Sequence, residues 1–146
     1  DKRKNQAFIQ SLNAGVYFVG ENTISEFNSL DEKYLGSWTR EEVYENLTNY
    51  TNLVLISSLE LQPLVCLEAL SAGLGLVISE AAAQNLDASL PFITIIPQDL
   101  IYNVEIVSAA ISDNRDNCIH IGREAIREYA ETFSWSNLIQ KYNNFL

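Results

Sequence analysis

Residues 52–79 constrain the fold more than any other part of the chain. Residues 52–57 (Asn-Leu-Val-Leu-Ile-Ser) form a short apolar run, which is typical of a strand buried on both faces of a parallel sheet. After a turn, residues 64–72 have a helical pattern that Gly73 ends, and residues 74–79 (Leu-Gly-Leu-Val-Ile-Ser) form a second apolar run. This order predicts a strand–helix–strand unit, from which parallel α/β sheets are built.

Two carboxylates, Glu60 and Glu68, belong to this unit. Glu60 lies just beyond the carboxyl end of the first strand, where open α/β sheets bind ligands. Glu68 lies within the helix, where an ordinary surface position is the alternative. Its neighbours Leu67, Ala69 and Leu70 leave the helix little polar face, and glutamate is rarely buried unless it is paired or used. Both carboxylates are therefore candidate binding residues.

Strands and helices alternate along the rest of the chain. We expect strands over residues 16–19, 33–36 and 92–96, and helices over residues 5–12, 39–50, 100–111, 117–132 and 134–146. Thr39-Arg40-Glu41-Glu42 is a capping box, and Ser134 is a plausible cap of the last helix. The alternation predicts one α/β domain, residues 1–146, with a doubly wound parallel sheet.

Composition and charge limit what this domain binds. The net charge of −10 and the pI of about 4.4 oppose binding to nucleic acids or anionic membranes, which requires basic surface. The two cysteines, Cys66 and Cys118, are too few for a disulfide framework and lack the spacing of metal ligands. His120 is the only histidine and has no recognisable nucleophile motif beside it, so we expect no hydrolase triad.

The ends of the chain suggest its context. No secretory signal and no apolar tract long enough to cross a membrane are visible, so we expect a cytoplasmic location. The glycosylation sequons at Asn46 and Asn49 are then chance matches. The chain contains no Met and opens, at Asp1-Lys2-Arg3, in the middle of a recognisable unit. We therefore expect a domain excised from a longer protein.

The segment from Glu60 to Gly73 (Glu-Leu-Gln-Pro-Leu-Val-Cys-Leu-Glu-Ala-Leu-Ser-Ala-Gly) resembles the paired-glutamate signature of retaining glycosyltransferases. These enzymes have two Rossmann-like domains (the GT-B architecture), and family 4, the glycogen-synthase-like group, is the most similar. The resemblance implies that Glu60 is catalytic and approaches the hydroxyls of the donor sugar. It implies that Glu68 holds the ribose of the nucleotide.

Other segments extend the resemblance over nearly the whole chain. Lys4-Asn5-Gln6 is similar to the element that begins the first helix of the family's donor-binding domain, and Val19-Gly20 resembles the end of its second strand. Residues 34–38 (Tyr-Leu-Gly-Ser-Trp) resemble its base-binding loop, and Phe133-Ser134-Trp135 its C-terminal ending. The strand that the family has before Lys4 is absent from this sequence, and the segment between the second and third strands is short.

The resemblance gives donor-binding roles to Lys4, Gly36 and Trp38. Lys4 would clamp a diphosphate together with the start of the first helix, whereas the alternative is a solvated charge run at a frayed terminus. Gly36 and Trp38 belong to the base-binding loop, although Trp38 can also simply pack in the core or at the rim of the sheet.

The chain departs from the family at Leu61-Gln62-Pro63, where a glycine-rich segment is more usual. Backbone N–H groups of that segment touch the sugar and phosphates in the family. Because Pro63 has no N–H, such contacts would fall to Leu64 and Val65. The departure puts the details of sugar recognition in question.

The function that the resemblance implies is transfer of a sugar, with retention, from a nucleotide-diphosphate sugar to an unknown acceptor. It implies no metal or other cofactor. The partners would be the nucleotide sugar and an acceptor-binding N-terminal domain of the same protein. A peripheral contact with a membrane would be made only through that N-terminal domain. Without that domain the fragment is expected to bind donor but not to transfer efficiently.

Two alternatives remain open. A nucleotide-sugar epimerase of the same architecture would need further acid or base residues, and a non-catalytic α/β module would have kept the fold but lost the site.

The last expected helix carries more apolar surface than one helix face needs, as a surface that contacts a further domain would. We expect part of it to be exposed, displaced or covered by a neighbour. The residues concerned are Phe133, Trp135, Leu138, Ile139, Tyr142 and Phe145.

Overall fold

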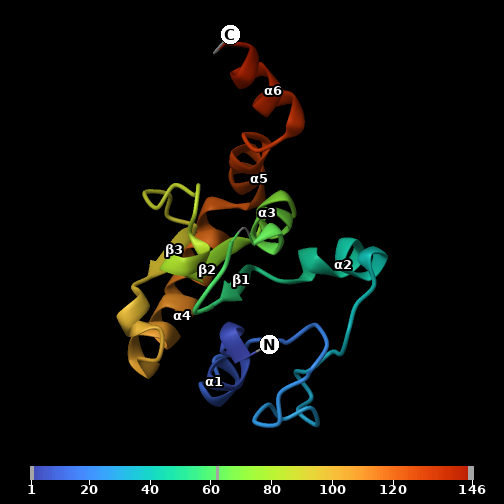
Figure 1. Cartoon of the computed structure of the whole chain (residues 1–146), viewed down its shortest axis with the longest axis vertical. Coiled ribbons are helices and arrows are strands. Elements are labelled where there is room, and N and C mark those ends of the chain that lie inside the picture. The colour runs from blue at the N-terminus through green and yellow to red at the C-terminus, as the bar shows by residue number, and fades with distance from the viewer. Residues whose placement is uncertain (1, 62, 145–146) are drawn as a thin grey trace.

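The computed structural model describes residues 2–61 and 63–144. Its centre is an open, three-stranded parallel sheet of β1 (Asn52–Leu55), β2 (Gly75–Ser79) and β3 (Ile93–Ile96), in the order β1-β2-β3 (Figure 1). These are the strands expected from the apolar runs in the centre of the sequence, each slightly shorter than predicted.

Helices cover the sheet on both faces. The longer ones are α1 (Gln6–Ser11), α2 (Arg40–Asn46), α3 (Leu64–Ser71), α4 (Val104–Ile121), α5 (Arg123–Glu131) and α6 (Trp135–Asn143). The short 3₁₀ turns are η1 (Lys2–Lys4), η2 (Leu47–Asn49), η3 (Glu80–Ala82) and η4 (Gln98–Leu100). Among the described residues, none of these helices combines the length and the apolar character that crossing a membrane requires.

Alternate residues of β2 pack against helices on opposite faces of the sheet. Leu76 and Ile78 belong to one apolar cluster with residues of α3 and α5, whereas Val77 belongs to a second cluster with residues of α1 and α4. All residues of β2 are buried. The fold is therefore α/β, with an open parallel sheet between two layers of helices, a character shared with Rossmann-like domains.

The expected helices over 100–111 and 117–132 are wrong in their boundary. A single helix, α4, runs from Val104 to Ile121 and ends at Gly122, after which α5 begins. Residues 112–117 are all polar in sequence, but the Asn114 side chain is completely buried. Its Nδ2 donates to the carbonyls of Leu76 and Phe92, each at 3.1 Å, so this polar residue attaches α4 to the sheet.

The expected strands over 16–19 and 33–36 are reduced to one parallel bridge between Phe18 and Tyr34. Phe18 N donates to Lys33 O at 2.8 Å, and Leu35 N donates to Phe18 O at 2.9 Å. Phe18 is nevertheless buried, together with Ile24 and Phe27, in the same cluster as Val77 of β2. The N-terminal region thus shares the core although it does not pair with the central sheet.

The expectation that β1 is buried on both faces is confirmed in part, because Leu53 and Leu55 pack in one apolar cluster and Val54 packs against the other, but the burial is incomplete. Three of its four residues are half-buried and only Leu55 is buried. The cause is that β1 has a strand partner, β2, on one side, while a pocket opens along its other edge. An apolar run therefore does not by itself guarantee a second neighbouring strand.

Local signals fix the helix ends as expected. Thr39 Oγ1 accepts from Glu42 N at 3.2 Å and Glu42 Oε2 accepts from Thr39 N at 2.7 Å, which is the predicted capping box. Ser134 Oγ accepts from Asn137 N at the start of α6. Helix α6 projects away from the sheet (Figure 1).

The apolar side chains of α6 have different environments. Trp135 and Ile139 are 80% and 55% exposed, as the expectation of partial exposure requires. Phe133 and Leu138 are half-buried, while the side chains of Tyr142 and Phe145 lie outside the described residues.

Candidate functional site

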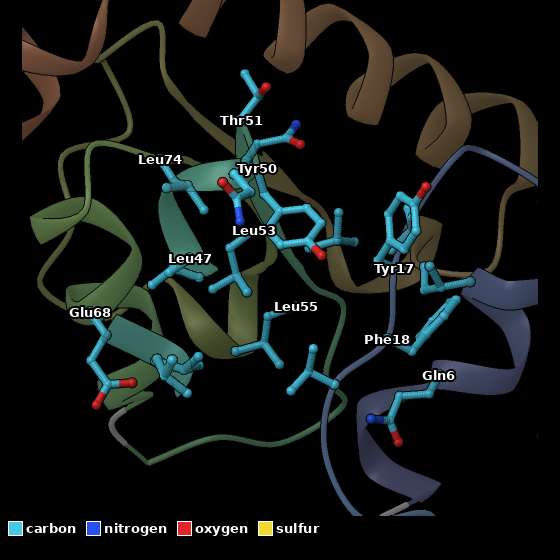
Figure 2. A pocket seen from close by; sticks show the side chains of 18 of the residues that line it. Gln6, Tyr17, Phe18, Leu47, Tyr50, Thr51, Leu53, Leu55, Glu68 and Leu74 are labelled. Carbon is cyan, nitrogen blue, oxygen red and sulfur yellow. The ribbon is translucent and has the colours of Figure 1, made fainter. Parts of the chain in front are cut away.

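A pocket of about 380 Å³ lies along the free edge of β1. One wall is β1 with Tyr50 and Thr51, and the other is the segment Val16–Val19. Figure 2 shows Tyr17 and Phe18 facing Leu53 and Leu55 across this space, with the ring of Tyr50 projecting between them. The rest of the lining comes from the start of the chain, from α2, η2, α3 and α4, and from Trp38 and Leu74.

The pocket brings together some of the residues that were predicted from distant parts of the sequence. Lys4, Trp38, Val65 and Glu68 all line it. The other three predicted residues do not line it and are Gly36, Glu60 and Leu64. Gly36 and Trp38 lie in the same loop, but only the tryptophan reaches the pocket.

Glu68 is positioned by the helical repeat of α3. The sides of this helix that carry Cys66, Ala69 and Leu70 are buried, which leaves Glu68 exposed. Glu68 is therefore a surface residue, as the alternative interpretation predicted. Its carboxylate nevertheless lies at the rim of the pocket, away from Tyr17 and Phe18 (Figure 2). An exposed carboxylate at a rim is free to accept hydrogen bonds from a ligand.

Arg40 lies near Glu68 and was not singled out in the sequence. A hydrogen bond of 2.7 Å from Arg40 Nε to the hydroxyl of Tyr44 raises the pKa of Arg40, and the negative charge of Glu68 contributes to the rise. The guanidinium also lies over the Tyr44 ring, 5.6 Å from its centroid. The capping box at Thr39 was the available signal, since it fixes the first turn of α2 and so the position of Arg40.

Lys4 closes the pocket at the carboxyl end of β1. It ends η1, is exposed, and precedes Asn5, which has the left-handed φ of 51°. Asn5 does not cap α1. Its Nδ2 donates to Ile56 O at 2.9 Å, and its Oδ1 accepts from the Tyr102 hydroxyl at 2.8 Å. These bonds hold the start of the chain against the end of β1 and keep Lys4 at the pocket.

Glu60 faces a different environment. Burial raises the pKa of the Cys66 thiol to about 12, and the negative charge of Glu60 contributes to the rise. Glu60 is therefore near Cys66, and it does not line the pocket. Leu61 and Leu64 beside it are exposed, and Pro63 is the N-cap of α3. Gln62, the middle residue of the departure from the family, lies outside the described residues.

Three aromatic rings that line the pocket pack on one another. Trp38 packs on Tyr50 with ring centroids 6.2 Å apart, and Tyr17 packs on Tyr50 at 5.6 Å. Burial raises the pKa of Tyr50, with a smaller contribution from Tyr17. Rim packing therefore accounts for the position of Trp38, and its ring still lines the pocket. Tyr17 and Tyr50 were missed because single aromatic residues near strands carry no distinctive motif.

Polar groups gather at the carboxyl edge of the sheet. Ser57 and Ser79, which follow Ile56 and Ile78, are completely buried, and Ser79 Oγ donates to Ser57 O at 2.6 Å. The repeated Ile-Ser ending of two parallel strands was a sequence signal for this pairing. Next to them, Glu80 Oε2 accepts from Gln98 N at 2.8 Å. These bonds connect the ends of all three strands.

Comparisons with models of protein families, with curated proteins and with solved structures give no significant match. Within the described residues, no three His, Cys, Asp or Glu side chains are grouped so that they could hold a metal ion. The geometry of the pocket therefore carries the functional argument by itself.

Proposed function

We propose that this pocket binds the nucleotide of a nucleotide-diphosphate sugar and that the chain is the donor-binding domain of a retaining glycosyltransferase. One observation carries the proposal: Lys4, Trp38 and Glu68, singled out separately in the sequence, line the same pocket. A cation, an aromatic ring and a carboxylate are the groups that a diphosphate, a base and a ribose require. The fold would then be one half of a doubly wound, two-domain architecture.

Each side chain would contribute by ordinary hydrogen bonding or stacking. Glu68, exposed at the rim, would accept hydrogen bonds from the ribose hydroxyls, and Lys4 would balance the charge of the diphosphate. Trp38 and Tyr50 would stack on the base. Because the domain carries a net charge of −10, phosphates must be held by such local cations against the overall field.

The reaction would be transfer of the sugar to an acceptor held by a second domain. Glu60 would approach the sugar hydroxyls, since it follows β1 at the carboxyl edge of the sheet. Positioning of the donor and support of the departing diphosphate would supply most of the rate enhancement.

Calorimetry with nucleoside diphosphates and the matching monophosphates tests the proposal. We expect the diphosphate to bind more tightly and its binding to weaken with salt. Glu68→Gln should weaken nucleotide binding by roughly 1–3 kcal/mol, the value of a hydrogen bond to a charged group. Glu41→Gln, which changes an exposed carboxylate in the first turn of α2, is the matched control. Equal affinity for diphosphate and monophosphate would contradict the role of Lys4.

A non-catalytic nucleotide-binding module is the second candidate, because Glu60 does not line the pocket that contains Glu68. Glu60→Gln separates the two functions. In a transferase it should leave nucleoside diphosphate binding unchanged and weaken only binding of the sugar-bearing donor. In a module without a sugar site, the variant and the parent should bind both ligands equally.

A further inference from the structure

Arg115 of α4 lines the pocket at the end opposite to Lys4. Asn114, the residue before it, accepts at Oδ1 from Asn52 Nδ2 at 3.1 Å, so this turn of α4 lies beside the amino end of β1. Lys4 lies at the carboxyl end, and the four residues of the strand span about 13 Å. One diphosphate cannot contact both cations across that length. If Lys4 balances the diphosphate, Arg115 therefore meets another part of the ligand.

The guanidinium of Arg115 is held in place and still has donors for a ligand. Its Nη2 donates to Ala14 O at 3.2 Å, and a Cβ built on Gly15 would lie 3.8 and 3.9 Å from its two terminal nitrogens. Arg115 is half-buried. Within the part of the chain that the structure describes, it forms no ion pair, and the bond to Ala14 is its only side-chain hydrogen bond. Because a guanidinium carries several N–H donors, the others remain for a ligand.

The aromatic side chains of the pocket follow this guanidinium along the lining. Gly15 is two positions before Tyr17, whose ring packs on Tyr50 with centroids 5.6 Å apart. Trp38 also packs on Tyr50, at 6.2 Å, and all of these residues line the same pocket. A base stacked on these rings would have the Arg115 donors at its edge.

We propose that Arg115 selects the base of the nucleotide and favours a base with a carbonyl acceptor, guanine or uracil, over adenine. The inference rests on the proposed function, because it requires a nucleotide in this pocket. Arginine has donors only, and it pairs with O6 and N7 of guanine through two hydrogen bonds. The O4 atom of uracil is likewise an acceptor. Adenine presents an amino donor where guanine has O6, so an Arg115 donor would face another donor.

Two other roles of Arg115 give a different pattern of binding. Its bond to Ala14 connects α4 to the segment before Val16, and loss of that bond alone would weaken the binding of every nucleotide equally. A contact with phosphate would also affect all nucleoside diphosphates alike. Only a contact with the base changes the ratio of affinities between nucleotides that differ in their base. That ratio is therefore the quantity to measure.

Calorimetry of the whole chain with guanosine, uridine and adenosine diphosphates tests the proposal. We expect the guanosine or the uridine diphosphate to bind about 5- to 150-fold more tightly than the adenosine diphosphate, the range of discrimination that a specific arginine contact supplies. Arg115→Gln should shift the ratio towards adenosine, because glutamine offers adenine both a donor and an acceptor. Arg115→Lys keeps the charge but lacks the planar fork, so it should reduce the preference.

Arg127→Gln is the matched control. Arg127 Nη2 also donates to a backbone carbonyl, Ala72 O at 3.3 Å, but Arg127 does not line the pocket. The ratio of affinities should therefore equal that of the parent. Since the preference of the parent is measured without any substitution, the test does not depend on how well a variant folds.

The ligands also distinguish the two bases. Tighter binding of the guanosine than of the uridine diphosphate, reduced in a 7-deaza analogue that lacks N7, would support the proposal with guanine as the base. The reverse order would support it with uracil.

Three outcomes contradict the proposal. Equal binding of the three diphosphates by the parent, or a preference for adenosine, would overturn it while the proposed nucleotide site stands. The same holds if Arg115→Gln weakens all three by one factor. Absence of binding of every nucleoside diphosphate would overturn the proposed function itself, and this inference with it.

Discussion

The central region, residues 64–79, and the N-terminal region, residues 13–38, have similar apolar runs but different structures. In the central region all residues of β2 are buried between strands and helices. In the N-terminal region the run Val-Tyr-Phe-Val forms only a bridge at Phe18, and Tyr17 and Val19 are 50% and 38% exposed. Both regions nevertheless contribute to the same apolar cluster.

The difference shows that an apolar run sets an extended backbone, whereas its neighbours decide whether it becomes a buried strand. Val77 has a strand on each side and a helical layer on each face, so burial stabilises it by about 1.5–3 kcal/mol. Tyr17 faces the pocket rather than a paired strand, and its side chain is half exposed. Substitutions should therefore cost much more free energy in the central region than in the N-terminal region.

The largest effect is expected at Gly75. A Cβ built on Gly75 would fall on Cys118 Sγ and would lie 2.9 Å from Asn114 Oδ1 and from Phe92 O. Gly75→Ala should therefore lower the free energy of unfolding by about 3 kcal/mol or more, because the core cannot accommodate extra volume. Urea denaturation measures the change. Adding Cys118→Ala should recover part of the loss, since it removes the closest contact.

The N-terminal control for this substitution is Gly36→Ala. A Cβ on Gly36 meets nothing within 4 Å, and the cost comes only from its φ of +75°, which L residues adopt at about 1 kcal/mol. A loss at Gly36 as large as that at Gly75 would contradict the contrast between the regions.

The next effect concerns the buried amide of Asn114. Its Nδ2 donates to two carbonyls and to Thr94 Oγ1, and its Oδ1 accepts from Asn52 Nδ2 at 3.1 Å. Asn114→Ala should destabilise the protein by about 2–3 kcal/mol, because buried acceptors lose their donor. Thermal unfolding followed by circular dichroism checks this. Asn117→Ala on the same helix, where the exposed amide donates only to Pro91 O, should cost less than about 1 kcal/mol.

The sequence allowed the central strands and helices to be predicted because their apolar runs and end signals agree. It did not allow the continuity of α4 to be predicted, because Asn114 is polar in sequence and its bonds are made to residues far along the chain. The reduced pairing of residues 16–19 could not be predicted either, because pairing depends on which segment lies beside them in the fold. Local patterns do not report contacts between distant segments.

The candidate site was predictable in part for the same reason. Lys4, Trp38, Val65 and Glu68 lie in recognisable segments, and they meet in one pocket. Glu60 was expected at the same site, but it does not line this pocket, since its position depends on the path of the turn before α3. Tyr50 lines the pocket through tertiary packing, so no motif identified it.

A smaller effect is expected from the thiol of Cys66. Burial raises its pKa from 9.0 to about 12, so the folded state keeps a proton that the unfolded chain releases. This contribution to stability is complete below about pH 9 and is lost as the pH rises towards 12. The free energy of unfolding should fall by about 1 kcal/mol between pH 8 and pH 10 from this residue.

Comparison of Cys66→Ala with the parent isolates this contribution. The stability difference between parent and variant should shrink by that amount over the same pH range, because other titrating groups cancel. Ile126→Val, a core change in the same cluster without a titrating group, should keep a constant difference from the parent. An identical pH dependence for Cys66→Ala and Ile126→Val would show that the thiol is not buried in solution.

The smallest effect is expected at Trp135, an apolar residue without the cover that the central region provides. Its side chain is 80% exposed, so Trp135→Ser should change the free energy of unfolding by less than about 0.5 kcal/mol. Phe133, two positions earlier, is half-buried and packs edge-on against Tyr129 with centroids 5.3 Å apart. Phe133→Ser should therefore cost about 1–3 kcal/mol through lost burial. If Trp135→Ser costs as much as Phe133→Ser in the same urea titration, a neighbouring chain or domain covers α6 in solution. Repeating the titration at several protein concentrations then distinguishes a neighbouring chain from a neighbouring domain, since only contact with another chain weakens on dilution.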